Sequence, residues 1–495
     1  MHASLWPIIG RSTCGFGCSW GLPACRGKLR APSIAAWDRG SMNGEKSLPA
    51  QVAQAYDLAV LARAGRPASL IDALMIKRLL LEALPQDAAF DAYRDALDLG
   101  PEVRLEPRRI GSLLAAAAAE AKEFHILHQG GEHVICEPPE IIGPGVAPRI
   151  EGVSRTVFVA CFENAVAHSR SGATQLGSEL CFDIQGDELD SLPVELRFDP
   201  LVFSRDGGEI EAIIDRRAVT TIKVDRAFSL MGLNTVSFGH WMLEGLPQFL
   251  GAQRTLNLDE VPLLIDAQMP PQHRQSLELL GRGRFPIIEV PRWARVEAGR
   301  LWRASNWFYS PHLLITDQGL DPRHFVLPMR AVAELYRFAA RISDQVLAVG
   351  GLDRETFIAR PSTLHRRVTN LGEIEAWLGS QGFALFFPEQ HPFGEQVLTV
   401  RESRNIVIQN GSAAHTLLLA RPETKVCYLS HPAFPIISLL AELLKNLDVE
   451  IKIVSGPFEQ KTEPYLDQSD YRIPLDRLQP MVEDWMRSGS ARERA

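Results

Sequence analysis

A histidine and a glutamate lie four residues apart in the segment Ser237–Pro247, at His240 and Glu244. On a helix this spacing places both side chains on one face. A carboxylate one turn away raises the basicity of an imidazole, so the pair could serve as a general base. On spacing alone, a buried histidine bonded to the backbone is the commoner explanation. No third ligand lies at the spacing of the helical zinc motifs, so the pattern does not favour a metal site.

A group of arginines follows the apolar run Thr356–Ala359. Arg360 closes the run, and Arg366 and Arg367 come shortly after it. An arginine at a strand end can bind a phosphate through two parallel hydrogen bonds, although an exposed, solvated charge is the alternative. Asn370, followed three residues later by Glu373, predicts a helix N-cap with a capping box.

Small polar residues follow another apolar run, at Asn410-Gly411-Ser412. Small side chains let the backbone approach a ligand, and the amides at the start of the next helix can receive a phosphate. Many strand-to-helix turns have this composition, so the signal is weak by itself.

These segments share one framework of alternating elements between Phe357 and Ser430. Apolar runs at 356–359, 383–387, 406–408 and 426–429 alternate with helical patterns, which predicts a parallel sheet covered on both faces. Ligands of such sheets bind at the carboxyl ends of the strands. We therefore expect Arg360, the segment Pro388–Gln396 and the Asn410–Ser412 turn to meet around a phosphorylated ligand.

The rest of the chain changes texture twice. Residues 49–124 carry helical patterns, with apolar stripes at 52–61, 70–84 and 109–124, whereas residues 133–225 read as short strands. A second α/β unit follows Asn234. We expect residues 1–48 to be disordered or to arise from a wrong start site, and the helical segment to form an extension for dimerisation or partner docking.

Composition limits the classes of function. The chain has 495 residues with a net charge of −8, which favours two large domains and argues against a general nucleic-acid surface. No run of about 18 apolar residues predicts a transmembrane helix. The scattered cysteines favour reduced thiols in a cytoplasmic protein. Neither a Gly-x-Gly-x-x-Gly fingerprint nor a Walker loop is present, which disfavours dinucleotide redox chemistry and ATP hydrolysis, and we expect no cofactor.

Taken together, the motifs resemble glycosyltransferase family 61, a group that includes bacterial capsular-polysaccharide enzymes. Gly239–Pro247 matches the family segment Gly-His-Trp-x-x-Glu-x-Leu-Pro, and Gly411–His415 matches Gly-Ser-Ala-x-His. Asn410 stands where many members have histidine, and Thr416 where asparagine often follows. The matching residues between these two segments are Arg360, Arg366, Arg367, Asn370, Gly382, Phe383, Pro388, Glu389, Glu395 and Gln396.

The resemblance implies an α/β protein of GT-B architecture, with two Rossmann-like domains facing a cleft and the helical extension before them. Within this scheme we expect an acceptor-side domain at 131–345 and a nucleotide-sugar domain at 346–460. The helical extension then covers 49–130, and a C-terminal helix and tail cover 461–495.

The implied activity is that of an inverting, metal-independent hexosyl- or pentosyltransferase, which moves a sugar from a nucleotide-sugar donor to a polysaccharide or surface-glycan acceptor. The catalytic candidates are His240 and Glu244. Arginines and helix amides would stabilise the departing diphosphate. The donor-binding candidates are Arg360, Arg366, Gln396, Asn410, Gly411, Ser412 and His415. We expect no nucleic-acid partner, a homodimer through the helical extension, and a cytoplasmic location that leaves peripheral membrane association open.

Two other classes of function remain open. One is a catalytically inactive, glycosyltransferase-like module that binds glycan or protein, which the departures at Asn410 and Thr416 would favour. The other is a different enzyme on a similar scaffold, such as a sugar-nucleotide epimerase or a ketal-forming transferase.

Overall fold

The computed structural model describes residues 70–97, 99–183, 199, 201–206, 209–214, 220–256, 261–267, 269–292, 294–308, 327–360, 366–433, 437–461 and 469–492. By its contacts the chain separates into Met1–Pro49 and Ala50–Ala495, and every described residue belongs to the second unit. The expectation for residues 1–48, and the apolar stripe at 52–61, lie outside the described residues.

The C-terminal part is built on a parallel sheet, as the alternating pattern predicts. Its core strands are β15 (Arg354–Ile358), β16 (Ala384–Phe386), β17 (Ser403–Gln409), β18 (Lys425–Ser430) and β19 (Glu450–Ser455). They run in the spatial order β16-β15-β17-β18-β19, and each neighbouring pair is parallel. The four predicted strands are therefore confirmed. The strand order reverses between β15 and β17, which is where sheets of this kind bind ligands.

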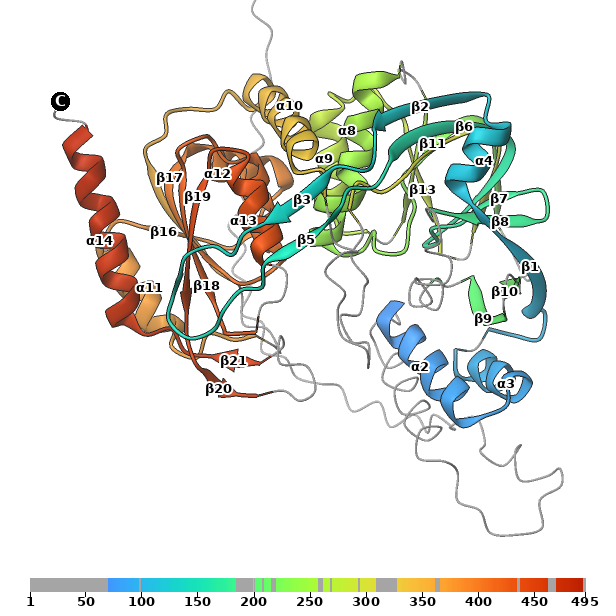
Figure 1. The fold of residues 1–495 in the computed structure, drawn as a ribbon, viewed down its shortest axis with the longest axis horizontal. Helices are drawn as coiled ribbons and strands as arrows, with labels where there is room; N and C mark the ends of the chain where they lie inside the picture. Colours follow the sequence, from blue (N-terminus) through green and yellow to red (C-terminus); the bar gives the residue numbers. More distant parts are fainter. Residues whose placement is uncertain are drawn as a thin grey trace, which may run out of the picture. The chain divides into compact units, whose positions relative to one another are not determined.

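Helices connect these strands (Figure 1). The connections are α11 (Leu371–Ser380), the short 3-10 turn η4 (Pro388–Gln390) with α12 (Phe393–Glu402), the 3-10 helix η5 (Ser412–Leu419), and α13 (Ile437–Lys445). Strands β17 and β18 are buried over almost their whole length, in keeping with their continuous apolar runs.

The N-terminal part is built on a larger, mixed sheet. Among the described residues this sheet has eleven strands, in the order β13-β12-β11-β14-β6-β7-β8-β1-β10-β9, with β2 beside β6. Strands β11 (Thr221–Ser229), β12 (Leu263–Asp266), β13 (Ile287–Val290) and β14 (Arg295–Ala304) are parallel. Beyond β14 the pairing is mainly antiparallel, beginning with β6 (Val157–His168). A Rossmann-like sheet was therefore a correct expectation only for the β11–β14 part.

The expected helix at 109–124 is wrong over much of its length. Only α4 (Leu113–Glu120) is helical, and it is flanked by β1 (Arg104–Ser112) and β2 (Glu123–His128). Strand β1 pairs with β8 (Glu179–Phe182) and β10 (Glu209–Ile214), and β2 pairs with β6. Pairing with strands so distant in sequence overrides the local alanine-rich pattern. Residues 49–130 are thus not a purely helical extension.

The helices α2 (Leu70–Ala83) and α3 (Gln86–Ala96) pack against β9 (Val202–Asp206) and β10 of the same chain. The ring of Phe203 lies 5.2 Å from that of Phe90 and 5.6 Å from that of Tyr93. The described apolar face of this helix pair is therefore used inside the chain.

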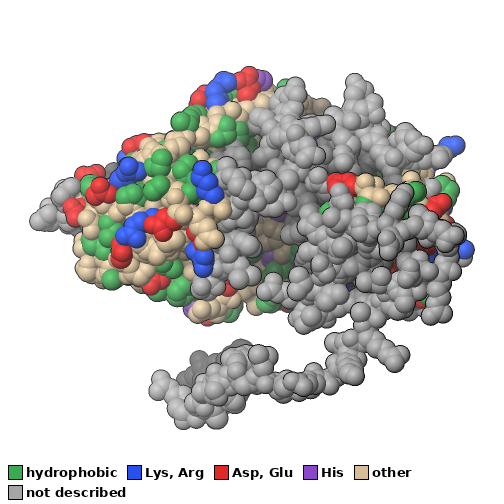
Figure 2. Space-filling model, turned by 90° about the horizontal axis from the view of Figure 1, so that it is seen from below, with side chains coloured by type: hydrophobic (Ala, Val, Ile, Leu, Met, Phe, Trp, Pro, Cys, Tyr) green, Lys and Arg blue, Asp and Glu red, His purple; other side chains and the backbone are tan. Residues whose placement is uncertain are grey.

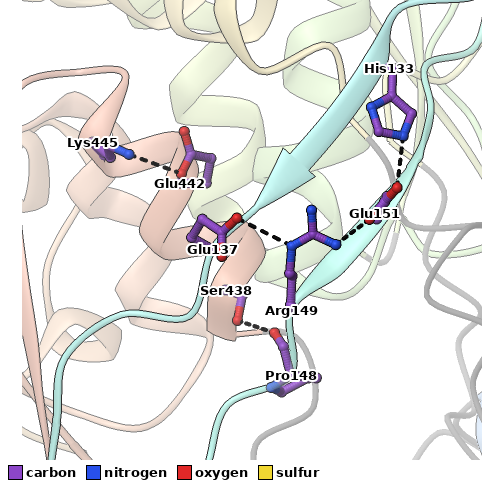
Figure 3. Close-up of polar contacts among 8 residues, drawn as sticks. All are labelled: His133, Glu137, Pro148, Arg149, Glu151, Ser438, Glu442 and Lys445. Atoms are coloured by element: carbon purple, nitrogen blue, oxygen red, sulfur yellow. Dashed lines mark hydrogen bonds and ion pairs between the residues drawn. The ribbon is translucent and has the colours of Figure 1, made fainter.

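A strap from the N-terminal part crosses onto the C-terminal sheet. It consists of the ribbon β3 (His133–Cys136) and β5 (Ile150–Val153), with β4 (Ile141–Ile142) between them in sequence. Strand β4 pairs with β19 as the sixth strand of the C-terminal sheet, although the sequence placed these residues in the acceptor-side domain. Figure 3 shows the strap beside α13, where Ser438 donates a hydrogen bond to the Pro148 carbonyl and Arg149 lies between Glu137 and Glu151.

The C-terminal helix is part of the core of the C-terminal sheet. Helix α14 (Leu475–Arg492) buries Leu478, Val482 and Trp485 in one cluster with Phe357 and Val407 of the strands. It belongs with the C-terminal sheet rather than with a separate tail.

Three properties complete the fold. Cys136, Cys161, Cys181 and Cys427 are free and buried, as expected. No helix in the described ranges is long and apolar enough to cross a membrane. Figure 2 shows acidic and basic side chains interspersed on the described part of the visible face, without a large patch of one sign.

Candidate active site

The His240–Glu244 pair lies on an irregular helical turn. Residues Phe238–His240 form α7, and Trp241–Gly245 form a π-helical turn, η2, that leads into α8 (Leu246–Thr255). Single π-turns inside helices are frequent at functional sites. His240 Nδ1 lies 2.8 Å from Glu244 Oε1, and the side chains are 18% and 12% exposed. The expected contact between His240 and Glu244 is present. Both side chains are partly buried, and a ligand can still reach them.

The turn depends on the glycine at position 245. A Cβ on Gly245 would lie 2.5 Å from the Trp241 ring, below the distance that real contacts tolerate. The Trp241 indole is buried, donates a hydrogen bond to Ser276 Oγ at 2.9 Å and stacks on His273 at 5.2 Å. Packing of Trp241 thus fixes the backbone that carries His240 and Glu244.

A pocket that is open to solvent adjoins the pair. Its wall includes the loop after β11 (Leu230–Thr235) and Arg303, Ala304 and Asn306 at the end of β14. These two strands are neighbours at the point where the order of the parallel strands reverses. The cavity therefore lies at a position where α/β sheets commonly bind ligands, with His240 and Glu244 on its rim.

Buried charges at strand ends hold the loops of this cavity. Asp266, at the end of β12, accepts hydrogen bonds from Arg170 N, Gly232 N and Thr235 Oγ1, and burial raises its pKa. In the same loop, Asn234 Nδ2 lies 3.5 Å from Glu244 Oε2. The network orients the carboxylate toward His240.

Arg303 is a second buried charge at this site. Its guanidinium donates hydrogen bonds to backbone carbonyls of Ser229, Met231 and Gly172, and burial lowers its pKa to about 10. Through these hydrogen bonds Arg303 supports the cavity wall.

On the C-terminal sheet, Arg360 and the turn after β17 come together at the reversal of strand order. Arg360 N donates to Gln409 Oε1 at 3.1 Å, and Arg360 Nη1 donates to the Asn410 carbonyl at 3.1 Å. A Cβ on Gly411 would lie 2.8 Å from Arg360 Cδ, so only glycine allows the arginine this approach. The expected grouping of Arg360 with Asn410–Gly411 is therefore observed.

Arg366 adds a second positive charge beside Arg360. Burial lowers the pKa of Arg360, and the charge of Arg366 lowers it further. Arg366 adopts a left-handed backbone conformation, with φ of 58°, and its buried Nε has no hydrogen-bond partner among the described residues. Neither arginine forms an ion pair within the described part of the chain, whereas the adjacent Arg367 is bound by Asp470. Two such cations held together favour an anionic ligand.

The turn that carries His240 is in contact with the segment that follows β17. His415, in η5, packs against Gly239, the residue before His240: a Cβ on Gly239 would lie 2.9 Å from His415 Cε1. The most distinctive segments of the two halves of the chain are thus neighbours in space.

Comparison with protein families agrees with this geometry. The model of the family Glycosyltransferase 61 matches residues 238–427. This part of the chain is similar to members of that family. The matched segment begins at Phe238, two residues before His240, and ends within β18, so it contains every candidate site residue. A comparison with curated proteins gave no match. The family indicates a glycosyltransferase.

Within the family 61 segment, Asn410 is a buried polar centre. Its Oδ1 accepts a hydrogen bond from Tyr428 Oη at 3.0 Å, and its Nδ2 lies 3.3 Å from His431 Nε2. Tyr428 and His431 were not expected at the site, although both lie near the end of β18, next to β17. Asn410 therefore organises the turn through its neighbours and offers its carbonyl to Arg360.

Gln396 and Ser412, two candidates of the matched segment, have different surroundings. Gln396 is buried, and its amide donates to the carbonyls of Pro388 and His391, so it shapes the turn before α12. Ser412 is exposed at the start of η5, beside Gly411. Of these two, Ser412 is the one placed to contact a ligand.

The predicted capping box at Asn370 is wrong. Asn370 occupies the N-cap position of α11, but its side chain does not cap the helix. Its amide instead donates to the Ile473 carbonyl and accepts from Ile473 N. The segment leading into α14 competes successfully for this side chain, which a local pattern cannot show.

Two residues of the cavity that the sequence pattern did not indicate share a position in the fold. Arg303 and Asp266 lie at the ends of parallel strands, as Arg360 does, and the rule that selected Arg360 would have selected them once β12 and β14 were recognised as neighbours of β11.

In the described residues, no group of three or more His, Cys, Asp or Glu is placed to hold a metal ion.

Proposed function

We propose that this protein is an inverting, metal-independent glycosyltransferase that transfers a sugar from a nucleotide-sugar donor to a glycan acceptor. The observation that carries the proposal is the Arg360–Arg366 cluster at the strand-order reversal of the parallel sheet, without a carboxylate ion pair in the described residues. A nucleoside diphosphate supplies the negative charge that this cluster lacks.

On the donor side, the cluster stabilises the departing diphosphate. The guanidinium of Arg360, that of Arg366 and the backbone at Gly411–Ser412 are the groups that would face the phosphates. Charge-assisted hydrogen bonds to phosphate are among the strongest in proteins, and in a site that excludes water they stabilise developing charge effectively. This arrangement supplies the stabilisation that a metal ion gives in other transferases.

On the acceptor side, His240 acts as the general base. Its Nδ1–H donates to Glu244, and Nε2 is the nitrogen that would take the proton of the acceptor hydroxyl. The hydroxyl oxygen attacks the anomeric carbon from the face opposite the diphosphate. The bond from that carbon to the phosphate oxygen breaks, and its electron pair leaves with the diphosphate. One displacement of this kind inverts the configuration.

The architecture we propose is a GT-B-like arrangement of two halves. The acceptor half comprises the mixed sheet of the 131–345 region, and the donor half comprises the parallel sheet of the 346–460 region. The strap around β4 and the helix α14 are assigned to the donor half, because they pair or pack with its strands.

The test begins with binding of nucleotide sugars by the full chain. A thermal-shift screen should identify a donor that stabilises the protein by about 2.7 kcal/mol at one hundred times its dissociation constant. Turnover with that donor is then followed by release of nucleotide, and the anomeric configuration of the product is determined.

His240→Ala is the decisive variant. We expect it to lower turnover by about 10²–10⁴-fold while donor affinity stays nearly the same, because general-base assistance is worth that much. Binding without turnover in the unmodified protein would instead support a glycan- or protein-binding module. A product that is an epimer of the donor, rather than a glycoside, would support another enzyme class.

A further inference from the structure

Gly239 and His415 link the turn that carries His240 to the turn that carries Gly411 and Ser412. A Cβ on Gly239 would lie 2.9 Å from His415 Cε1 and 3.1 Å from Nδ1. Real Cβ contacts do not reach the shorter of these distances, so any other residue at position 239 would push the ring away. Position 239 directly precedes His240, so a shift there moves the base.

The imidazole of His415 is fixed from its own side as well. His415 Nδ1 lies 2.9 Å from the Ser412 carbonyl, one turn earlier in η5, so Nδ1 carries the proton and donates. Ser412 follows Gly411, which is in contact with Arg360. The ring is thus tied to the turn that approaches the arginine cluster.

This bonding does not suit a phosphate group. Burial lowers the pKa of His415 to about 4, so the ring is neutral at ordinary pH. A neutral imidazole has one N–H, and that of His415 is committed to Ser412. It therefore has no proton to donate to a phosphate, although the sequence placed His415 among the donor-binding residues.

We propose that His415 is a positioning residue, whose contact with Gly239 fixes the distance between the donor turn Gly411–Ser412 and the base His240. The inference rests on the proposed function. In-line transfer requires reacting atoms about 3–3.5 Å apart, and a misplacement of about 1 Å can cost 10²-fold in rate. A contact of glycine with a fixed ring is suited to holding that distance.

The experiment compares Gly239→Ala, His415→Ala and the double variant in the full chain. Gly372→Ala is the matched control, because Gly372 is also helical and no atom lies within 4 Å of its added Cβ. For each protein, kcat at saturating donor, the donor dissociation constant and the midpoint of urea unfolding are measured.

We expect each single variant to lower kcat by about 10–100-fold and to leave the donor dissociation constant within about threefold. The double variant should be no slower than His415→Ala alone, because removal of the ring makes room for the added methyl group. The Gly372→Ala control should keep wild-type kcat.

Three results would overturn the proposal. They are a wild-type kcat for Gly239→Ala, a donor affinity lowered more than tenfold by His415→Ala at unchanged kcat, and losses that simply multiply in the double variant. Absence of turnover in the unmodified chain would refute the proposed function and, with it, the role of the contact in catalysis. Non-additive unfolding midpoints would in that case still establish the contact itself.

Discussion

Arg360, Arg366 and Arg367 lie close together in the sequence but have different surroundings in the structure. Arg367 is held by Asp470 through its guanidinium and its backbone amide, and is therefore structural. Arg360 and Arg366 have no carboxylate ion pair in the described part of the chain, and Arg360 is half-buried. Holding two like charges close together costs free energy, which an anionic ligand would recover.

Replacing Arg360 with alanine should weaken nucleotide-sugar binding by about 1.5–3 kcal/mol, the usual loss for a charge-assisted hydrogen bond. Isothermal titration calorimetry with the donor identified in the screen measures the change. Arg354→Ala is the matched control, because Arg354 begins the strand that Arg360 follows and lies at its opposite end. Equal affinities of the two folded variants would remove Arg360 from the donor site.

His273 is a residue whose burial has a consequence for stability. It is fully buried and stacked on Trp241, and its Nδ1 donates to the Thr235 carbonyl. Its Nε2 has no hydrogen-bond partner among the described residues, and burial lowers its pKa to about 4. Protonation in the folded state would place an unpaired charge beneath the π-turn.

The unfolded chain binds this proton near pH 6.5, whereas the folded chain binds it only near pH 4. The free energy of unfolding should therefore fall as pH decreases between these values, by up to about 1.4 kcal/mol per unit from His273. Urea unfolding of wild type and His273→Gln at pH 7 and pH 5 measures the contribution. The variant should lose less stability over this interval, and an equal loss in both proteins would contradict the prediction.

At the scale of elements, the start of helix α12 shows how the two parts of the chain support each other. Phe393 N, at the first position of α12, donates to Gln275 Oε1 of α9 (Pro271–Leu280) at 2.8 Å. Gln272 of the same helix donates to the His391 carbonyl. The first amide of α12 is thus capped by a side chain of α9, from the N-terminal part of the chain.

Gln275→Ala should lower the free energy of unfolding by about 1 kcal/mol, as loss of a helix cap usually does. Because α12 also carries Gln396, which holds the neighbouring turn, the donor dissociation constant should rise as well. Gln345→Ala, at an exposed position of α10 (Met329–Leu347), is the control for urea unfolding. A stability equal to that of this control would show that the cap contributes nothing.

The packing of helices α2 and α3 bears on the expected dimer interface. Ala89, Phe90 and Tyr93 of α3 are buried against Phe203 of β9 within the same chain. The apolar stripes that suggested a dimer interface are, where described, part of the internal core.

At the scale of the whole molecule, one core joins the two sheets. Trp241 and Phe249 of the acceptor half, Tyr336 of α10, and Ile408 and Leu417 of the donor half belong to the same buried cluster. Because the turn that carries His240 and the strand that precedes Asn410 both pack into this core, its packing sets their relative placement.

The sequence predicts no set of metal ligands, so the activity of the full chain can be tested for dependence on a metal ion. Turnover of the donor should be unchanged after dialysis against EDTA, because the arginine cluster provides the positive charge at the phosphates. The assay is run with and without added Mg²⁺ or Mn²⁺. Turnover that disappears in the chelator and returns with either ion would refute the metal-independent mechanism.

The local sequence by itself determined the parallel sheet of the C-terminal part. Its strands are short, continuous apolar runs separated by helical patterns, and such runs need only be buried on both faces to pair. The rule that ligands bind at strand ends then selected Arg360 and Asn410–Gly411 without knowledge of the strand order. The i, i+4 spacing of His240 and Glu244 was similarly sufficient to predict their contact.

Only the tertiary structure decided the remaining features. Strands β1 and β2 depend on partners far away in sequence, and the side chain of Asn370 is taken by Ile473, about one hundred residues later. The contact of His415 with Gly239 joins two segments that each look complete in isolation. Local patterns report which faces must be buried, but the partner that buries them is chosen by packing of the whole chain.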